Sequence, residues 1–334
     1  MFWMNDKSSL LLKDLGETDP SINNKRLIDW YWERIKERIE KSRGAWKKWK
    51  VVCPNLMDDI EDIVRVPAIQ LLQKNVDLTN KLTSFSLDVK KEAPSVFNYT
   101  TFLGTNYNIA HKLAKYLDCN VCVYCGRIYT NTVIKNGKCI IHPTFDHFFP
   151  KGEYPLLALS FFNLIPSCYN CNCTTKGQSP ISSNTTYLHP YINSADEINS
   201  CFKFSYRLGS SANKNDRIKI EIGAGGTDKT GTDVSTKVNN STSDFFIEDV
   251  YQVHNSYELK KMLDNRNRFS PQRIKDMLKK NIMSEEELYG LILGDDIGLD
   301  DKEELNRPLF KLKNDLASEI FPAEYLYLKN RRKV

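Results

Sequence analysis

The chain has 334 residues, of which 41% are hydrophobic and 27% are charged, and its formal net charge is +5. This length allows about two domains, and the composition supports a hydrophobic core, which excludes a largely disordered chain. The mild positive charge is compatible with nucleic acid as a partner but does not by itself identify one.

Residues 1–110 are predicted to form a helical N-terminal region. Apolar residues recur there at helical spacing in separate runs, namely Ile28, Trp32, Ile35 and Ile39, and then Ile60, Ile63 and Val64 before Pro67. Residues 1–16 lack the apolar core of a signal peptide, because Asn5, Asp6, Lys7 and Lys13 interrupt it, so we expect a cytoplasmic protein. The basic run 41–50 contains Trp46 and Trp49 and has two interpretations. It can track phosphates with stacked indoles, or its tryptophans can lie in the core beneath a solvated face, which we favour slightly.

Residues 111–190 are predicted to form a core with a structural zinc. A helical run with Ile109, Leu113, Tyr116 and Leu117 leads into two Cys-x2-Cys pairs, Cys122/Cys125 and Cys168/Cys171. Two such pairs at this separation are typical of a tetrahedral zinc site, and Gly126 permits the tight turn after the second thiolate. Of the nine cysteines, Cys119 and Cys173 are interpreted as spare, and the three others as small core residues: Cys53, Cys139 and Cys201.

Residues 191–334 are predicted to form an α+β C-terminal accessory region. Two alternating runs, 202–208 and 218–222, predict a β-hairpin, and the Gly/Thr/Ser-rich segment 223–243 predicts a flexible loop. Ser270-Pro271 and the Ser284/Glu287 pair predict two helix starts. A last apolar stripe follows at Leu309, Leu312, Leu316 and Ile320.

The most apolar stretch of the whole chain, 155–166, is too short to cross a bilayer, so we expect no membrane partner.

Between the cysteine pairs lie residue types that suit phosphodiester hydrolysis. That reaction needs an activated water and a cation that neutralises the developing charge. Asp146 offers a hard oxygen ligand for Mg²⁺ or another divalent cation, and His147 can take a proton from water. Neighbours on a strand point to opposite faces, so both can serve one site only at a strand end or a bulge. Taken alone, an Asp-His pair is common, and His147 is then better interpreted as a hydrogen-bonded structural residue.

The order of motifs resembles a known family. Cys-x2-Cys-Gly, then Asp146-His147-x-x-Pro150, then Asn163-Leu164, then Cys-x2-Cys-Asn172 resembles the HNH endonucleases of the ββα-metal fold over about 55 residues. The resemblance implies that His147 is the general base, that Asp146 and Asn172 ligate the catalytic metal, and that Asn163 braces the loop that orients His147. Asn170 remains a rival for the second metal-ligand position.

The same resemblance implies nucleic-acid contacts for Lys151 and Lys176. The family usually places a lysine three residues after the last asparagine, whereas Lys176 comes four after Asn172. Weaker outer motifs, such as 189–191, 250–254 and 307–312, look like the nuclease subunit of Septu-type anti-phage defence systems. Such subunits work beside an ATPase, so that resemblance implies an ATPase partner from a defence operon.

We therefore expect an α+β protein with a zinc-stapled ββα-metal core over 111–190, flanked by the helical and α+β regions. The expected activity is metal-dependent hydrolysis of nucleic acid, with DNA favoured over RNA. The competing hypothesis is a zinc-stabilised module that binds nucleic acid or protein without catalysis. Intact Asp146, His147 and Asn172 argue against that alternative.

Overall fold

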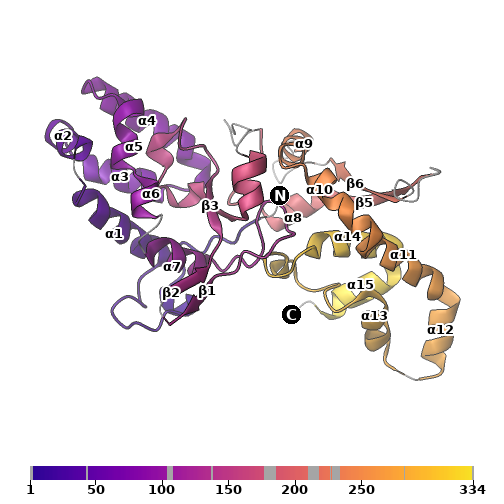
Figure 1. Cartoon of the computed structure of the whole chain (residues 1–334). Coiled ribbons are helices and arrows are strands. Elements are labelled where there is room, and N and C mark those ends of the chain that lie inside the picture. Colours follow the sequence, from indigo (N-terminus) through magenta and orange to yellow (C-terminus); the bar gives the residue numbers. More distant parts are fainter. Residues whose placement is uncertain are drawn as a thin grey trace. The chain divides into compact units, whose positions relative to one another are not determined.

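A computed structural model of the chain describes residues 3–332, except 43, 104–107, 137, 177–185, 210–217, 226, 228–233 and 282 (Figure 1). Over these residues the fold is α+β and mostly helical, with three two-stranded antiparallel sheets. The chain divides into two compact units. The N-terminal unit comprises Trp3–Val123 and Tyr129–Ser194, and the C-terminal unit comprises Tyr124–Ile128 and Ala195–Val334. Among the described residues, no helix is both long and apolar enough to cross a membrane.

The N-terminal unit begins with helices whose apolar faces form its core. Their bounds are η1 (Leu12–Leu15), α1 (Leu27–Glu40), α2 (Ala45–Val52), α3 (Leu56–Arg65), η2 (Ala68–Gln70), α4 (Leu71–Ser84), α5 (Val89–Val96), α6 (Tyr99–Phe102) and α7 (Asn108–Leu117). The apolar residues that predicted α1, α3 and α7 are all buried. Trp46 and Trp49 of α2 are buried as well, and the Trp49 indole donates to Glu92 at 2.6 Å, so the core interpretation of these tryptophans is confirmed.

Two of the small sheets follow in the same unit. Strands β1 (Val133–Lys135) and β2 (Lys138–Ile141) form an exposed hairpin, whereas β3 (Thr144–His147) pairs with β4 (Leu164–Ser167) in the interior. Between β3 and β4 the chain makes two 3₁₀ turns, η3 (Pro155–Leu157) and η4 (Phe161–Asn163). A π-helical turn, η5 (Asn170–Thr175), follows β4 and contacts β3.

The C-terminal unit contains the predicted hairpin and the predicted late helices. The hairpin consists of β5 (Phe202–Leu208) and β6 (Ile218–Ala224), and it buries Phe202, Phe204 and Ile220. The other elements are α8 (Ala195–Cys201), α9 (Ser235–Asp244), α10 (Ile247–Tyr251), η8 (Gln252–Ser256), α11 (Glu258–Arg268), α12 (Pro271–Lys279), α13 (Glu285–Leu293), η9 (Asp301–Leu305), α14 (Phe310–Ile320) and α15 (Pro322–Arg331).

Local signals for helix starts are confirmed in this unit, and one loop prediction is wrong in part. The Ser270 hydroxyl accepts from the Arg273 amide, and Ser284 and Glu287 form a reciprocal capping box. The loop predicted over 223–243 gives way to helix α9 from Ser235 onward, because burial of Val238 outweighs the weak helix preference of its polar residues. Residues 226 and 228–233 of that predicted loop lie outside the described residues.

Candidate functional site

Four cysteine thiols converge on one point, as the two Cys-x2-Cys pairs predict. The sulfur atoms of Cys122, Cys125, Cys168 and Cys171 all lie within 4.8 Å of one another, and all four residues are buried. A tetrahedral zinc with Zn–S bonds of about 2.3 Å holds its sulfurs about 3.8 Å apart, so the cluster fits a structural metal such as zinc. The Cys168 amide donates to the Cys122 sulfur at 3.2 Å, which suits a thiolate rather than a thiol.

The other cysteines stand outside this cluster, as the sequence predicts. Cys119 is buried, and burial raises the pKa of its thiol to about 12, so it is a poor ligand or nucleophile. Cys173 is exposed, and Cys53 and Cys201 are buried as predicted. Cys139 is only half-buried, so its assignment to the core is wrong, because it lies on the exposed strand β2.

Asp146 and His147 occupy the end of β3, where a strand can present neighbouring residues to one site. Asp146 pairs with Ile165 and His147 with Leu164 of β4, after which the chain leaves the sheet. Both residues are buried. The strand end that the Asp-His pair requires is therefore present.

The His147 ring is held in one tautomer. Its Nε2 lies 3.0 Å from the carbonyl oxygen of Ala158, and a carbonyl only accepts, so the proton is on Nε2 and the lone pair is on Nδ1. Burial lowers the pKa of His147 to about 3, helped by the charges of Lys151 and Lys176 and opposed by the Ala158 hydrogen bond. An unperturbed imidazole would titrate near 6.5. The ring is therefore uncharged at physiological pH.

The N-terminal helices hold the loop that presents Ala158. The Tyr31 hydroxyl of α1 donates to the Leu159 carbonyl at 2.9 Å, and the Ser160 hydroxyl donates to the Ile63 carbonyl of α3 at 2.7 Å. Both bonds are buried, where a hydrogen bond constrains geometry strongly. Helices of the first hundred residues therefore fix the partner of the His147 ring.

Asn163 ties the two ends of the same loop together. Its side-chain amide donates to the carbonyls of Phe149 (3.1 Å) and Leu157 (3.0 Å), and its oxygen accepts from the Phe149 amide at 2.8 Å. The side chain is fully buried, so these bonds replace water completely. Asn163 therefore holds Phe149 and Leu157 in fixed positions relative to each other.

Lys176 reaches the Asp146 carboxylate from the end of η5. Its ammonium forms a buried ion pair with Asp146 and also donates to the His147 carbonyl. Burial lowers the pKa of Lys176, while the Asp146 charge opposes that shift. A π-helical turn accommodates one residue more than an α-helical turn, which explains how Lys176 faces β3 although it comes four residues after Asn172.

The other predicted site residues are Asn172, its rival Asn170, and Lys151. Asn172 is half-buried in η5 and its backbone N–H donates to the Cys168 carbonyl at 3.1 Å, whereas its rival Asn170 is exposed. Lys151 is exposed, and its ammonium lies 5.3 Å from the centre of the Tyr99 ring. Tyr99 in turn contacts the His147 ring edge-to-face, with the ring centres 4.5 Å apart.

Tyr99 and His189 are two neighbours of the site to which the sequence analysis assigned no role. Tyr99 belongs to the N-terminal helices, and only the fold brings it to His147. His189 is fully buried against Phe148, with ring centres 4.0 Å apart, and burial lowers its pKa to about 3. The His189-Pro190-Tyr191 motif was visible in the sequence but carried no positional signal.

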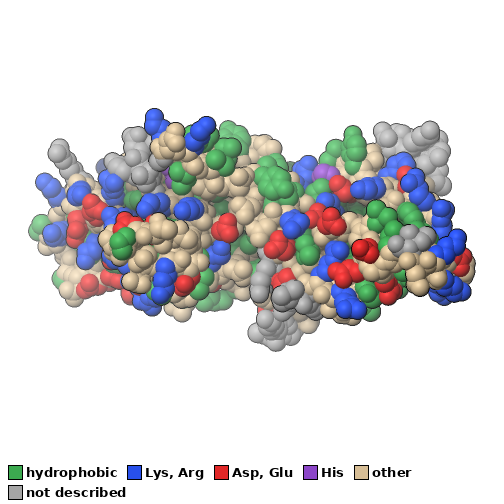
Figure 2. Space-filling view, turned by 90° about the horizontal axis from the view of Figure 1, so that it is seen from below, with side chains coloured by type: hydrophobic (Ala, Val, Ile, Leu, Met, Phe, Trp, Pro, Cys, Tyr) green, Lys and Arg blue, Asp and Glu red, His purple; other side chains and the backbone are tan. Residues whose placement is uncertain are grey.

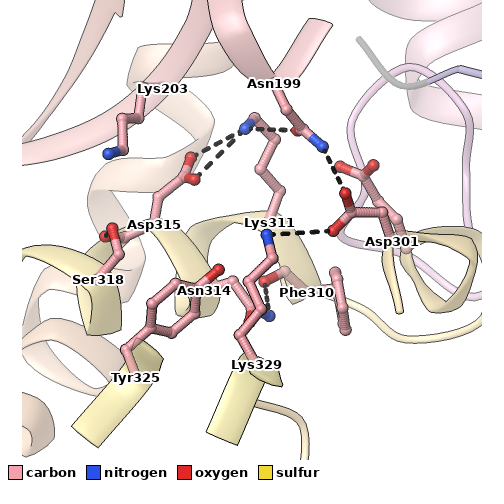
Figure 3. A pocket seen from close by; sticks show the side chains of 11 residues that line it. Asn199, Lys203, Asp301, Phe310, Lys311, Asn314, Asp315, Ser318, Tyr325 and Lys329 are labelled. Carbon is pink, nitrogen blue, oxygen red and sulfur yellow. Dashed lines mark hydrogen bonds and ion pairs between the residues drawn. The ribbon is translucent and has the colours of Figure 1, made fainter. Parts of the chain in front are cut away.

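A cavity of about 230 Å³ lies elsewhere, within the C-terminal unit (Figure 3). At its centre Lys311 donates to Asn199 at 2.9 Å and pairs with Asp315 at 3.1 Å. Burial raises the pKa of Glu304, which also lines the cavity, to about 7. Because its central lysine is matched by a carboxylate and an amide, we interpret this cluster as a structural network rather than a reaction centre.

Comparison with protein-family models, curated proteins and solved structures finds no match to this chain.

Proposed function

We propose that the chain is a metal-dependent endonuclease of the HNH type that hydrolyses nucleic-acid phosphodiesters. The observation that carries the proposal is the state of His147. Its proton is held on Nε2 by Ala158, which leaves the lone pair on Nδ1, and it sits beside Asp146 at the end of a strand. A general base needs such a fixed tautomer with a free lone pair.

Each residue has a defined task in this mechanism. His147 Nδ1 takes the proton from the attacking water, and the Ala158 carbonyl stabilises the imidazolium that results. Asn163 and the anchoring bonds of Tyr31 and Ser160 keep the loop, and hence the ring, in place. A divalent cation such as Mg²⁺, held by Asp146 and Asn172, would supply charge neutralisation for the phosphate oxygens. The four-cysteine cluster stabilises the fold around them.

The proposed substrate and partners follow from the resemblance of the motifs to HNH endonucleases. Nucleic acid is the substrate, with DNA favoured over RNA, and Lys151 is an exposed cation beside Tyr99 at the site. Lys176 is buried and engaged with Asp146, so a phosphate contact would require that pair to open. An ATPase partner and a role in anti-phage defence remain part of this proposal.

One observation favours a second candidate, a metal-stapled binding module without catalysis. The Lys176 ammonium already neutralises Asp146, the side chain that would hold the catalytic cation. If that pair never opens, the site is structural. The two candidates differ in whether a divalent cation binds at Asp146 and whether nucleic acid is cut.

Nicking of supercoiled plasmid in the presence of Mg²⁺, with single-stranded DNA and RNA as further substrates, tests the proposal. His147→Ala should lower cleavage by about a hundredfold or more, the usual loss for a general base, with zinc content unchanged. His142→Ala is the matched control, because that imidazole is exposed and packs on His111 instead. Equal cleavage by His147→Ala and the parent protein would show that another site performs the chemistry.

A further inference from the structure

The positive charge of this protein is concentrated in one short segment of the C-terminal unit. Residues 258–280, which comprise α11, α12 and the turn between them, contain eight Lys and Arg against three Asp and Glu, a net charge of +5. The whole chain has 47 Lys and Arg against 42 Asp and Glu, also +5, so the rest has 39 of each and is neutral. We call residues 258–280 the basic segment.

Most cations of the basic segment have no ion-pair partner among the described residues. Only Lys260 and Arg266 pair, with Asp264 at 2.5 Å and with Glu324 at 3.3 Å. Six exposed cations remain without an ion pair: Lys261, Arg268, Arg273, Lys275, Lys279 and Lys280. Lys275 and Lys279 stand one helical turn apart on α12, where like charges repel and destabilise the helix. An anionic partner would remove that repulsion.

Helix α12 presents these charges on an open surface. Ile274 is its one buried residue, and in Figure 1 the helix projects from the edge of its unit. In Figure 2 lysine and arginine side chains gather at the same end. An α-helix fits the major groove of a duplex, and its Lys and Arg side chains can reach the phosphates on either side.

The chemistry of the exposed face separates two kinds of anionic partner. Membrane-surface helices combine basic residues with a broad apolar face that inserts among the lipids. The exposed side chains of α12 are instead polar or charged apart from Pro271: Gln272, Arg273, Lys275, Asp276 and Lys279. The helix therefore lacks the apolar anchors that a lipid surface requires, while phosphate contacts require none.

We propose that the basic segment is a docking surface for double-stranded nucleic acid, with α12 as its central element. The inference rests in part on the proposed function, which supplies the reason for a nucleic-acid partner. It adds a binding surface composed entirely of residues outside the candidate site. Duplex binding can be measured under conditions in which no cleavage occurs. The docking surface and the proposed endonuclease activity can therefore be refuted separately.

The test compares two double variants of the full-length, zinc-loaded protein. Lys275→Gln/Lys279→Gln removes two cations from α12, and Lys90→Gln/Lys91→Gln removes two exposed cations from α5 as the matched control. Glutamine has nearly the helix preference of lysine, so both variants should fold. Fluorescence anisotropy of a labelled DNA duplex of about 30 base pairs is followed over a series of NaCl concentrations without added Mg²⁺.

Log affinity falls as log salt concentration rises, and each lost phosphate contact should make this fall less steep by about 0.9. Lys275→Gln/Lys279→Gln should therefore reduce the steepness by about 1.8. At about 0.1 M salt the same term corresponds to roughly a tenfold or greater loss of affinity, and the control should change little. Equal effects of the two double variants would overturn the proposal. So would tighter binding to phosphatidylserine vesicles than to the duplex. The two proposals can also give opposite results. If Lys275→Gln/Lys279→Gln loses duplex binding while His147→Ala still cleaves, this surface is supported and the proposed general base is refuted.

Discussion

The buried Lys176–Asp146 pair makes a quantitative prediction about metal binding. Lys176→Met keeps most of the side-chain volume but removes the ammonium. The two side chains are only 4% and 8% exposed, and removing one partner of such a pair typically costs about 3–5 kcal/mol. Against a total stability on the order of 5–15 kcal/mol, this loss is easily measured as a lower urea midpoint.

A divalent cation should recover part of that loss if Asp146 is a metal ligand. The cation would then take over the counter-charge, and ligand at about 100 times its Kd contributes roughly 2.7 kcal/mol. In the parent protein the cation must first displace the Lys176 ammonium, so it should stabilise less. Urea unfolding with and without Mg²⁺ or Mn²⁺, on protein that retains its zinc, measures both effects.

Lys311→Met is the matched control for this experiment. Lys311 is equally buried and also pairs with an aspartate, Asp315, but it belongs to the structural network of the C-terminal unit. It should lose comparable stability and gain nothing from Mg²⁺ or Mn²⁺. The assignment of Asp146 as a metal ligand is refuted if the cation rescues both variants equally, or if it fails to rescue Lys176→Met.

Three further predictions concern stability and metal content. Asn163→Ala removes three buried hydrogen bonds and leaves the Phe149 amide buried, so it should cost about 3–5 kcal/mol in urea unfolding; a cost below about 1 kcal/mol would show that Asn163 does not brace the loop. Cys168→Ser should release the metal, and metal analysis should fall from about one zinc per chain to nearly none; full retention would contradict the four-thiolate site. Burial raises the pKa of Glu304 from 4.5 to about 7, so its stabilising effect is complete below pH 4.5 and is lost as pH rises through 7. Glu304→Gln should remove this loss of about 3 kcal/mol between pH 4.5 and 8, and an unchanged pH dependence would refute the assignment.

Features encoded by residues close together in the sequence were predictable. The cysteine spacing indicated the thiolate cluster, the alternation at Phe202 and Phe204 indicated a strand, and Ser284 with Glu287 indicated a capping box. Each of these signals depends on geometry that a few residues determine on their own.

Features that depend on long-range packing were not predictable. The contact between Lys176 and Asp146 joins residues 30 positions apart and needs the π-helical turn. The tautomer of His147 depends on the Ala158 carbonyl, whose position is fixed by anchors on α1 and α3. Helix α9 forms from residues with weak helix preference because the tertiary environment stabilises it. Charge counting over short windows, in contrast, would have found the basic segment from the sequence.

The segment Tyr124–Ile128 is synthesised long before the residues that it contacts in the C-terminal unit. Its ring contact and hydrogen bonds within the C-terminal unit involve residues from position 245 onward. Tyr124 stacks on Phe245, the Cys125 carbonyl accepts from the Tyr251 hydroxyl at 2.6 Å, and the Gly126 carbonyl accepts from the Leu309 amide at 2.8 Å.

Positions 126 and 309 are 183 residues apart, a delay of roughly 10 to 40 seconds at ribosomal rates of about 5–20 residues per second. Cys122 and Cys125 emerge before that interval and Cys168 and Cys171 early within it, while the backbone of the first Cys-x2-Cys pair still lacks its later contacts. A nascent chain that stops before residue 251 would carry every thiolate but none of the hydrogen bonds that Tyr251 and Leu309 supply to this turn.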